Sequence, residues 1–199
     1  MMSFPSLEEI EHYFAGSWRM MTGRKDGVDR LDISVDGFWR SFHGITVSLP
    51  ALLVSWVAFA RDLPESYDDE GFRFGAVVSA GIADILAWIA PIVVLALIAR
   101  RLGLSRRFSV YVIASNWGGA LLTWIALPPN LLRLVWPDGR DVALAASVII
   151  FGAELVLSYR LAQLAWQRPP AIALPLFIGL TACSMAVTVL FQVLLGIGP

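Results

Sequence analysis

Five long apolar runs constrain the fold of this chain more than any other feature of its sequence. The runs cover residues 41–60, 74–99, 108–128, about 142–161 and about 171–195. At a rise of about 1.5 Å per residue, a helix of this length crosses the roughly 30 Å hydrocarbon core of a bilayer. Backbone amides in lipid must be bonded internally, and no run shows the alternation of a barrel strand. The sequence therefore predicts an all-α, polytopic membrane protein with five transmembrane helices.

Composition supports this fold class and excludes several functions. Hydrophobic residues make up 57% of the 199 residues and charged residues only 16%, and the mean hydropathy is +0.69. A soluble domain of this size carries more charge. The net charge of −1 gives no basic footprint for nucleic acid. The single cysteine, Cys183, lies inside the fifth run, which excludes a disulfide framework and a cysteine-rich metal site.

Residues 1–40 differ from the rest and predict a cytoplasmic amphipathic segment, followed by a transmembrane domain over residues 41–199. They begin polar and acidic, so no cleavable signal is expected. Ser6 and Glu9 fit a capping box, and Gly23 fits a helix stop. One helical stripe is apolar: Leu7, Ile10, Phe14, Trp18 and Met21. This helix is expected to pack against the bundle or to lie on the membrane surface.

Short motifs mark the ends of the runs. Asp36-Gly37 suggests a turn, and Phe38-Trp39, Trp136 and Trp166 lie where aromatic side chains anchor a membrane boundary. The segment LPPNLLRLVWPDGRD, residues 127–141, predicts a short interfacial helix between the third and fourth spans.

The distribution of Lys and Arg predicts the orientation, because basic residues concentrate on the cytoplasmic side. One side holds Arg19, Arg24, Lys25, Arg30, Arg40, Arg100, Arg101, Arg106, Arg107, Arg160 and Arg168. The other side holds Arg61, Arg73, Arg133 and Arg140. The N-terminus is therefore expected in the cytoplasm and the C-terminus outside, in a bacterial inner membrane.

Two carboxylates lie inside the apolar runs, Asp84 in GIADILAWIAP and Glu154 in the fourth run. A charge at the centre of a span costs roughly 2.5 to 3.5 kcal/mol on insertion scales, so both acids should point into the bundle. No Lys or Arg lies centrally in a run, so each acid is protonated, hydrogen-bonded or in contact with water. By depth, Glu154 is expected near Asn116, whereas a direct pair with Asp84 is not favoured. Structural bonding, proton or ion handling and contact with a missing subunit stay open for both acids.

Small and hydroxylated residues repeat at helical spacing inside three runs. They are Ser41, Ser48 and Ser55; Ser109, Asn116 and Thr123; and Thr181, Ser184, Thr188 and Gln192. Such stripes are typical of close helix packing, and a polar translocation path is the alternative.

Chemical motifs are absent from the sequence. There is no G-x-S-x-G, H-E-x-x-H, P-loop or G-x-G-x-x-G, and the histidines are His12 and His43. The loop acids Asp62, Glu65, Asp68, Asp69 and Glu70 lack the ordered spacing of a calcium loop and are expected to be solvated. No catalytic residue, cofactor or metal site is predicted, and the protein is expected not to be an enzyme.

Five spans, an amphipathic N-terminal segment and a third run that opens RRFSVYVIASNWGGALL after a basic loop resemble the Yip1-domain membrane proteins. The resemblance covers roughly residues 36–198. It implies an integral membrane protein, with partners in vesicle trafficking for eukaryotic members and no defined role for bacterial ones. It assigns no site residues.

Two functional hypotheses follow. The first is a non-enzymatic scaffold or accessory subunit that packs in the lipid bilayer against a membrane-protein partner or against copies of itself. The second is a small proton-linked or ion-linked transporter that uses Asp84 and Glu154. The first is preferred from the sequence, because 21.8 kDa is small for an alternating-access carrier and no inverted repeat is evident.

Overall fold

The computed structural model of the chain describes residues 4–63 and 70–194, and every regular element in these two ranges is helical. In chain order the elements are α1 (Leu7–Met21), η1 (Lys25–Arg30), α2 (Val35–Arg40), α3 (His43–Arg61), α4 (Glu70–Ala99), α5 (Phe108–Ile125), α6 (Leu127–Val135), η3 (Pro137–Gly139), α7 (Arg140–Trp166) and α8 (Pro170–Leu194). The helix α6 confirms the short helix predicted between the third and fourth runs.

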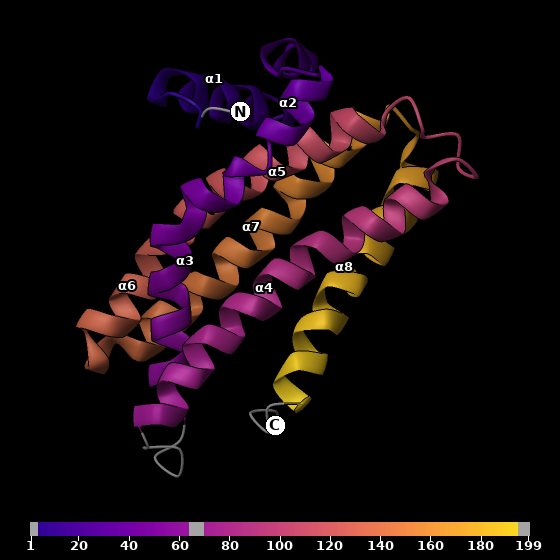
Figure 1. The fold of residues 1–199 in the computed structure, drawn as a ribbon. Coiled ribbons are helices and arrows are strands. Elements are labelled where there is room, and N and C mark those ends of the chain that lie inside the picture. Colours follow the sequence, from indigo (N-terminus) through magenta and orange to yellow (C-terminus); the bar gives the residue numbers. More distant parts are fainter. Residues whose placement is uncertain (1–3, 64–69, 195–199) are drawn as a thin grey trace.

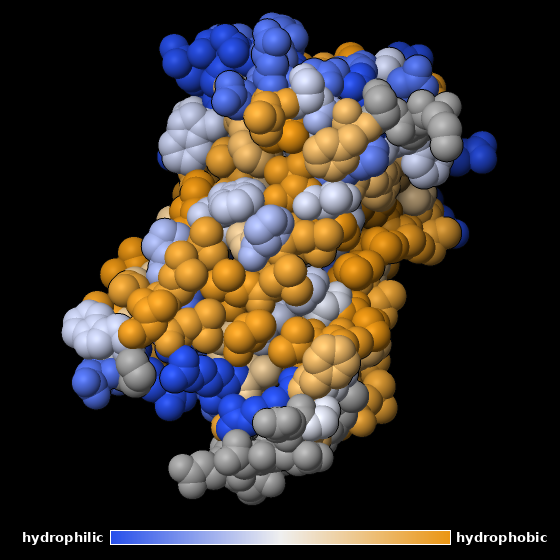
Figure 2. Space-filling model, turned by 60° about the vertical axis from the view of Figure 1, so that its left-hand side comes forward, coloured by the Kyte–Doolittle hydropathy of each residue, from blue (hydrophilic) through white to orange (hydrophobic). Residues whose placement is uncertain are grey.

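Five helical segments are long and apolar enough to cross a membrane, which confirms that part of the prediction. They are Val35–Arg61, Gly71–Ala99, Phe108–Val135, Arg140–Trp166 and Pro170–Leu194. Figure 2 shows polar surface at two opposite ends of the molecule and a broad hydrophobic region between them. In the most apolar windows of α7 and α8 only 6% of the residues are buried. The long helices thus direct apolar side chains outward, which is the surface that lipid accommodates.

The long helices pack as two pairs joined by α3. Helix α4 lies along α8, and α5 lies along α7, while α3 contacts both α4 and α5 (Figure 1). The short α6 packs against α3 and α7. Helix α1 crosses one end of the bundle and α6 lies at the opposite end, and we call these the α1 end and the α6 end (Figure 1).

The N-terminal segment shares a hydrophobic core with the long helices. Tyr13 of α1 stacks on Trp117 of α5, with ring centroids 4.8 Å apart and planes 25° from parallel. Met20 and Met21 are buried in the same core, beside Leu161 of α7. The predicted capping box is confirmed, because the Ser6 hydroxyl accepts from the Glu9 amide and the Glu9 carboxylate accepts from the Ser6 amide. Helix α1 is therefore held to the bundle by packing.

The predicted docking stripe of α1 is wrong in two members. Ile10 and Met21 are buried and Phe14 packs at the edge of the core, but Leu7 is 80% exposed and Trp18 is 44% exposed. At about 100° per residue, the buried face is turned about a quarter turn from the apolar stripe. The reason is the partner. On α5 the ring of Trp117 stacks on Tyr13. On the same face, η1 approaches Gly16 so closely that a Cβ there would lie 3.0 Å from the Gly27 carbonyl oxygen.

The predicted turn at Asp36-Gly37 is also wrong, because both residues lie in α2. The Ser34 hydroxyl caps this helix by accepting from the Gly37 amide at 3.0 Å. Gly37 is required here, because a Cβ would lie 1.9 Å from the Asp32 carbonyl oxygen. An acidic residue after a serine N-cap is favourable in the first turn of a helix.

Of the three tryptophans predicted to anchor membrane boundaries, Trp39 and Trp136 are substantially exposed, at 53% and 48%. Trp166 is 1% exposed and packs against Tyr111, with ring centroids 4.7 Å apart. It belongs to a core that joins α4, α7 and α8 at the α1 end, together with Leu95, Leu104 and Ala173. The interpretation of Trp166 as an anchor is therefore corrected to a core residue.

Candidate functional site

Asp84 faces α3, where it meets the indole of Trp56. The Trp56 Nε1–H donates to Asp84 Oδ2 at 2.6 Å. Gly81, one turn earlier on α4, makes room for this ring, since a Cβ there would lie 3.1 Å from Trp56 Cζ3. Asp84 Oδ1 accepts no hydrogen bond from the described part of the chain. Asp84 thus points into the bundle, with one oxygen held and one available.

A chain of hydrogen bonds runs from α4 towards the α1 end. Trp88, one turn after Asp84, donates its Nε1–H to Asn116 Oδ1 at 3.1 Å. The Asn116 amide donates to the Ser41 hydroxyl at 2.9 Å, and that hydroxyl donates to the Phe38 carbonyl at 2.7 Å. Asn116 is 2% exposed, so these bonds satisfy a buried amide. They join α4 and α5 to the end of α2.

No hydrogen bond joins Glu154 to Asn116, because the Asn116 side chain bonds to Trp88 and Ser41 instead. Counting residues along each helix gives the depth of a side chain in the bundle, but it does not give the direction in which that side chain points. Glu154 lies on α7 and is half-buried, and its carboxylate accepts no hydrogen bond from residues 4–63 or 70–194. Glu154 and Asn116 nevertheless line one cavity.

This cavity has a volume of about 580 Å³ and is lined mainly by residues of α3, α4, α5, α7 and α8. Both acids of the apolar runs, Asp84 and Glu154, line it, and Met21 of α1 borders it. Its other polar residues are Ser48, Ser55, Ser115, Asn116, Thr123, Asn130, Ser158, Thr181, Ser184 and Thr188. We call it the central cavity.

The polar stripes predicted from the sequence converge on the central cavity. Seven of their ten members line it, which favours a polar chamber over seams that only pack. Ser41 instead holds Asn116, and Gln192 lines a neighbouring cavity. Among the polar lining residues, Ser115 and Asn130 were not predicted. Ser115 adjoins a predicted residue but is outside its seven-residue spacing, and Asn130 lies on α6, beyond the predicted third span.

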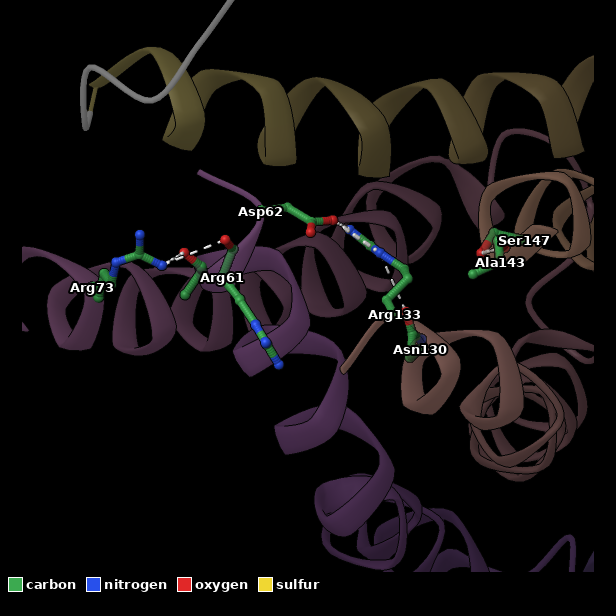
Figure 3. A network of polar contacts seen from close by, with 8 residues as sticks. Arg61, Asp62, Arg73, Asn130, Arg133, Ala143 and Ser147 are labelled. Carbon is green, nitrogen blue, oxygen red and sulfur yellow. Dashed lines mark hydrogen bonds and ion pairs between the residues drawn. The ribbon is translucent and has the colours of Figure 1, made fainter. Parts of the chain in front are cut away.

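A second cavity of about 250 Å³ lies towards the α6 end and shares part of its wall with the first. The shared residues are Ser55, Trp56, Asp84, Asn130 and Thr188. Arg133 lines this second cavity and forms an ion pair with Asp62 at the end of α3. Figure 3 shows this pair, with Arg133 also reaching Asn130 and with Arg73 pointing to the carbonyl of Arg61. Asp84 and Trp56 therefore line both the central cavity and this second cavity, which we call the vestibule.

A metal centre is not formed by the described residues, which contain no group of three or more His, Cys, Asp and Glu that could hold an ion. The loop acids Glu65, Asp68 and Asp69 lie outside the described residues, and Asp62 is paired with Arg133. Chemically, the central cavity offers two carboxylates, hydroxyls and aromatic rings. Among the described residues that line it, none is Lys, Arg or His.

Comparison with protein-family models, with curated proteins and with solved structures finds no match to this chain. The resemblance to Yip1-domain proteins therefore stays a prediction.

Proposed function

We propose that this protein is a small, non-enzymatic membrane transporter that moves a cation in exchange for or together with protons, using Asp84 and Glu154. The observation that carries this proposal is the central cavity, which brings both carboxylates and the polar residues of four long helices to one chamber. A carboxylate without a basic partner in an apolar setting has two ways to be neutralised, which are a proton and a bound cation. Alternation between them is the basis of coupled transport.

A carrier must be able to open its chamber towards one end and then towards the other. The two ends of this cavity are held by different interactions, which supports the proposal. At the α1 end, the hydrogen bonds from Trp88 through Asn116 to Ser41 join the helices, and Met21 borders the cavity. At the α6 end, the second cavity continues from Asp84 to the pair of Asp62 and Arg133. The chamber thus has one side held by neutral hydrogen bonds and packing, and one side held by a charged pair.

We place the protein in a bacterial inner membrane with the α1 end in the cytoplasm. The excess of Lys and Arg near this end supports that orientation. The described end of α8, at Leu194, lies at the α6 end, as an odd number of crossings requires.

The test is proton movement in reconstituted vesicles that contain a pH-sensitive dye. Gradients of Na⁺, K⁺, tetramethylammonium and benzyltrimethylammonium are imposed in turn. At least one gradient is expected to drive proton movement with the unchanged protein. Asp84→Asn and Glu154→Gln are expected to abolish it, because neither amide releases a proton.

The matched control is Asp141→Asn, which removes a carboxylate from the exposed first turn of α7, outside both cavities. It is expected to keep full activity. Absence of proton movement with every cation, or activity that survives in both carboxamide variants, would contradict the proposal.

The scaffold or accessory-subunit hypothesis stays a prediction with its own measurement. Purification from the native membrane in mild detergent would yield a stoichiometric membrane-protein partner if that hypothesis holds. A carrier is expected to purify alone or with copies of itself.

A further inference from the structure

The size of the central cavity bears on what it binds. Its volume of about 580 Å³ falls within the roughly 300–1,000 Å³ of small-molecule sites, and one water occupies only about 30 Å³ of liquid. A divalent metal ion usually needs several carboxylate ligands, and the described residues contain no group of three or more His, Cys, Asp and Glu that could hold one. The space therefore suits an organic molecule.

The charge of the lining selects the sign of the ligand. Asp84 on α4 and Glu154 on α7 reach the cavity from different helices, and the described lining residues include no Lys, Arg or His. Asp84 Oδ1 and the Glu154 carboxylate accept no hydrogen bond from the described chain. An anion would meet uncompensated negative charge there, whereas a positively charged nitrogen would supply the missing partner.

The aromatic and aliphatic residues of the lining suit a ligand whose uncharged part is apolar. Five aromatic residues line the cavity, Trp56, Trp88, Tyr111, Phe151 and Phe177, and most of the other lining residues are aliphatic. Aromatic rings attract cations through their π faces, and tryptophan does so best. Pro91 of α4 also lines the cavity. Because proline has no N–H, the carbonyl of Ala87, a lining residue one turn earlier, receives no helical hydrogen bond from it.

We propose that the central cavity binds a hydrophobic organic ammonium, with a positively charged nitrogen between Asp84 and Glu154 and an aromatic or alkyl body against Trp56 and Trp88. This inference rests on the proposed function and names the substrate class of the same site. It requires both features of the ligand, charge and apolar body, because the lining supplies a partner for each.

Equilibrium binding to the full chain in nanodiscs of zwitterionic lipid tests this, measured by calorimetry with three soluble probes. Benzyltrimethylammonium has charge and an aromatic body, tetramethylammonium has charge alone, and benzyl alcohol has an aromatic body alone. Benzyltrimethylammonium is expected to bind at least about tenfold more tightly than either of the others, which corresponds to about 1.4 kcal/mol. Equal affinity for the three probes, or no binding of benzyltrimethylammonium, would overturn the inference.

Variants locate the site. Asp84→Asn and Glu154→Gln are each expected to weaken binding of benzyltrimethylammonium about tenfold or more, and Asp141→Asn to leave it unchanged. Binding unaffected by both carboxamides would place the probe elsewhere and overturn the assignment. The comparison of probes uses the unchanged chain, so it decides the matter even if a variant does not fold. Proton movement driven by Na⁺ or K⁺ without binding of benzyltrimethylammonium would overturn this inference and leave the proposed function standing.

Discussion

Asp84 accepts a hydrogen bond from Trp56 and also carries an ionisable carboxyl group. Different substitutions separate the contribution of that bond from the contribution of the charge. Trp56 donates an indole N–H to it in a half-buried setting, and Gly81 leaves space for the ring. In Asp84→Asn the side-chain carbonyl still accepts this bond, so we expect nearly unchanged thermal stability in detergent. Asp84→Leu leaves the indole N–H without an acceptor and adds bulk beside Gly81, which we expect to cost about 1 to 2 kcal/mol.

The control for the leucine variant is Ile82→Leu, at an exposed position of α4 outside both cavities. It shows how much a leucine on this helix costs by itself. Equal melting temperatures for Asp84→Leu and Asp84→Asn would mean that the bond from Trp56 contributes nothing to stability.

Glu9 makes the docking of α1 depend on pH. The hydrogen bond from the Ser6 amide and the Arg40 guanidinium lower the pKa of the Glu9 carboxyl from its ordinary value. A carboxyl whose pKa is lower in the folded state stabilises that state above its unfolded pKa, about 4.3, and loses this contribution as pH falls through the folded value. The protection factors of the α1 amides, which correct for the slower intrinsic hydrogen exchange in acid, should therefore fall on acidification below about pH 4.3.

Glu9→Gln is expected to flatten this pH dependence, because glutamine keeps the capping box but does not titrate. The control is Glu8→Gln, an exposed neighbour in the same turn. Some acid sensitivity should persist in Glu9→Gln, since the pKa of Asp26 is also lowered by its bond to Arg19. Identical profiles for Glu9→Gln and the unchanged chain would refute a role for this carboxyl.

At the scale of elements, the face of α1 that holds it to the bundle is defined by Tyr13. Its ring stacks on Trp117 inside the shared core, whereas Trp18 is 44% exposed. Removing a buried ring costs about 3 kcal/mol, so Tyr13→Ala should release α1 and make the bonds after Arg24 and Lys25 sensitive to trypsin. Trp18→Ala should leave the cleavage rate near that of the unchanged protein. Faster cleavage in Trp18→Ala than in Tyr13→Ala would restore the face predicted from the apolar stripe.

The long helices could largely be predicted from the sequence. Which face of a helix packs against the rest of the molecule could not. Apolar length places five long helices because hydropathy accumulates over about 20 residues. The docked face of α1 depends on which surface meets Trp117 and η1, and that information lies in other parts of the chain. Apolar residues such as Leu7 can remain exposed, while Ser17 is fully buried. The Asp36-Gly37 pair was misread because the same residues suit a turn and the first turn of a capped helix.

At the scale of the whole molecule, the inward direction of Asp84 and Glu154 followed from the cost of charge in lipid. The cavity that joins them did not follow, because a chamber depends on the distances between helices. Periodicity gives the side of a helix that is polar, but it does not distinguish a packed seam from a hollow one. Asn116 illustrates this limit: its place inside the bundle was expected, and its partners Trp88 and Ser41 were not.

The orientation of the molecule is tested by a reporter fused after Pro199. The α1 end carries most of the Lys and Arg residues, and the described part of α8 ends at the opposite, α6 end. A periplasm-active reporter is therefore expected to be active, and a cytoplasm-active reporter to be inactive. The reverse pattern would contradict either the orientation or the number of crossings.

The ion pair of Asp62 and Arg133 is expected to control access to the chamber from the α6 end. Arg133 lines the second cavity, and the pair joins the end of α3 to α6 (Figure 3). Ser55 lines both cavities, so a cysteine there reports whether a water-soluble thiol reagent can enter. In a Cys183→Ala background, labelling of Ser55→Cys should become several-fold faster when Arg133→Gln breaks the pair.

Exchange of the two charges, Asp62→Arg with Arg133→Asp, should restore slow labelling, because the attraction between α3 and α6 returns. The control position is Ser147→Cys, whose native hydroxyl bonds to the Ala143 carbonyl on α7 and which lines neither cavity (Figure 3). Its labelling should not respond to Arg133→Gln. If Ser55→Cys reacts at one rate with the pair intact, broken and exchanged, the pair does not close the vestibule, and access to Asp84 must be governed by the packing of α4 against α3 and α8.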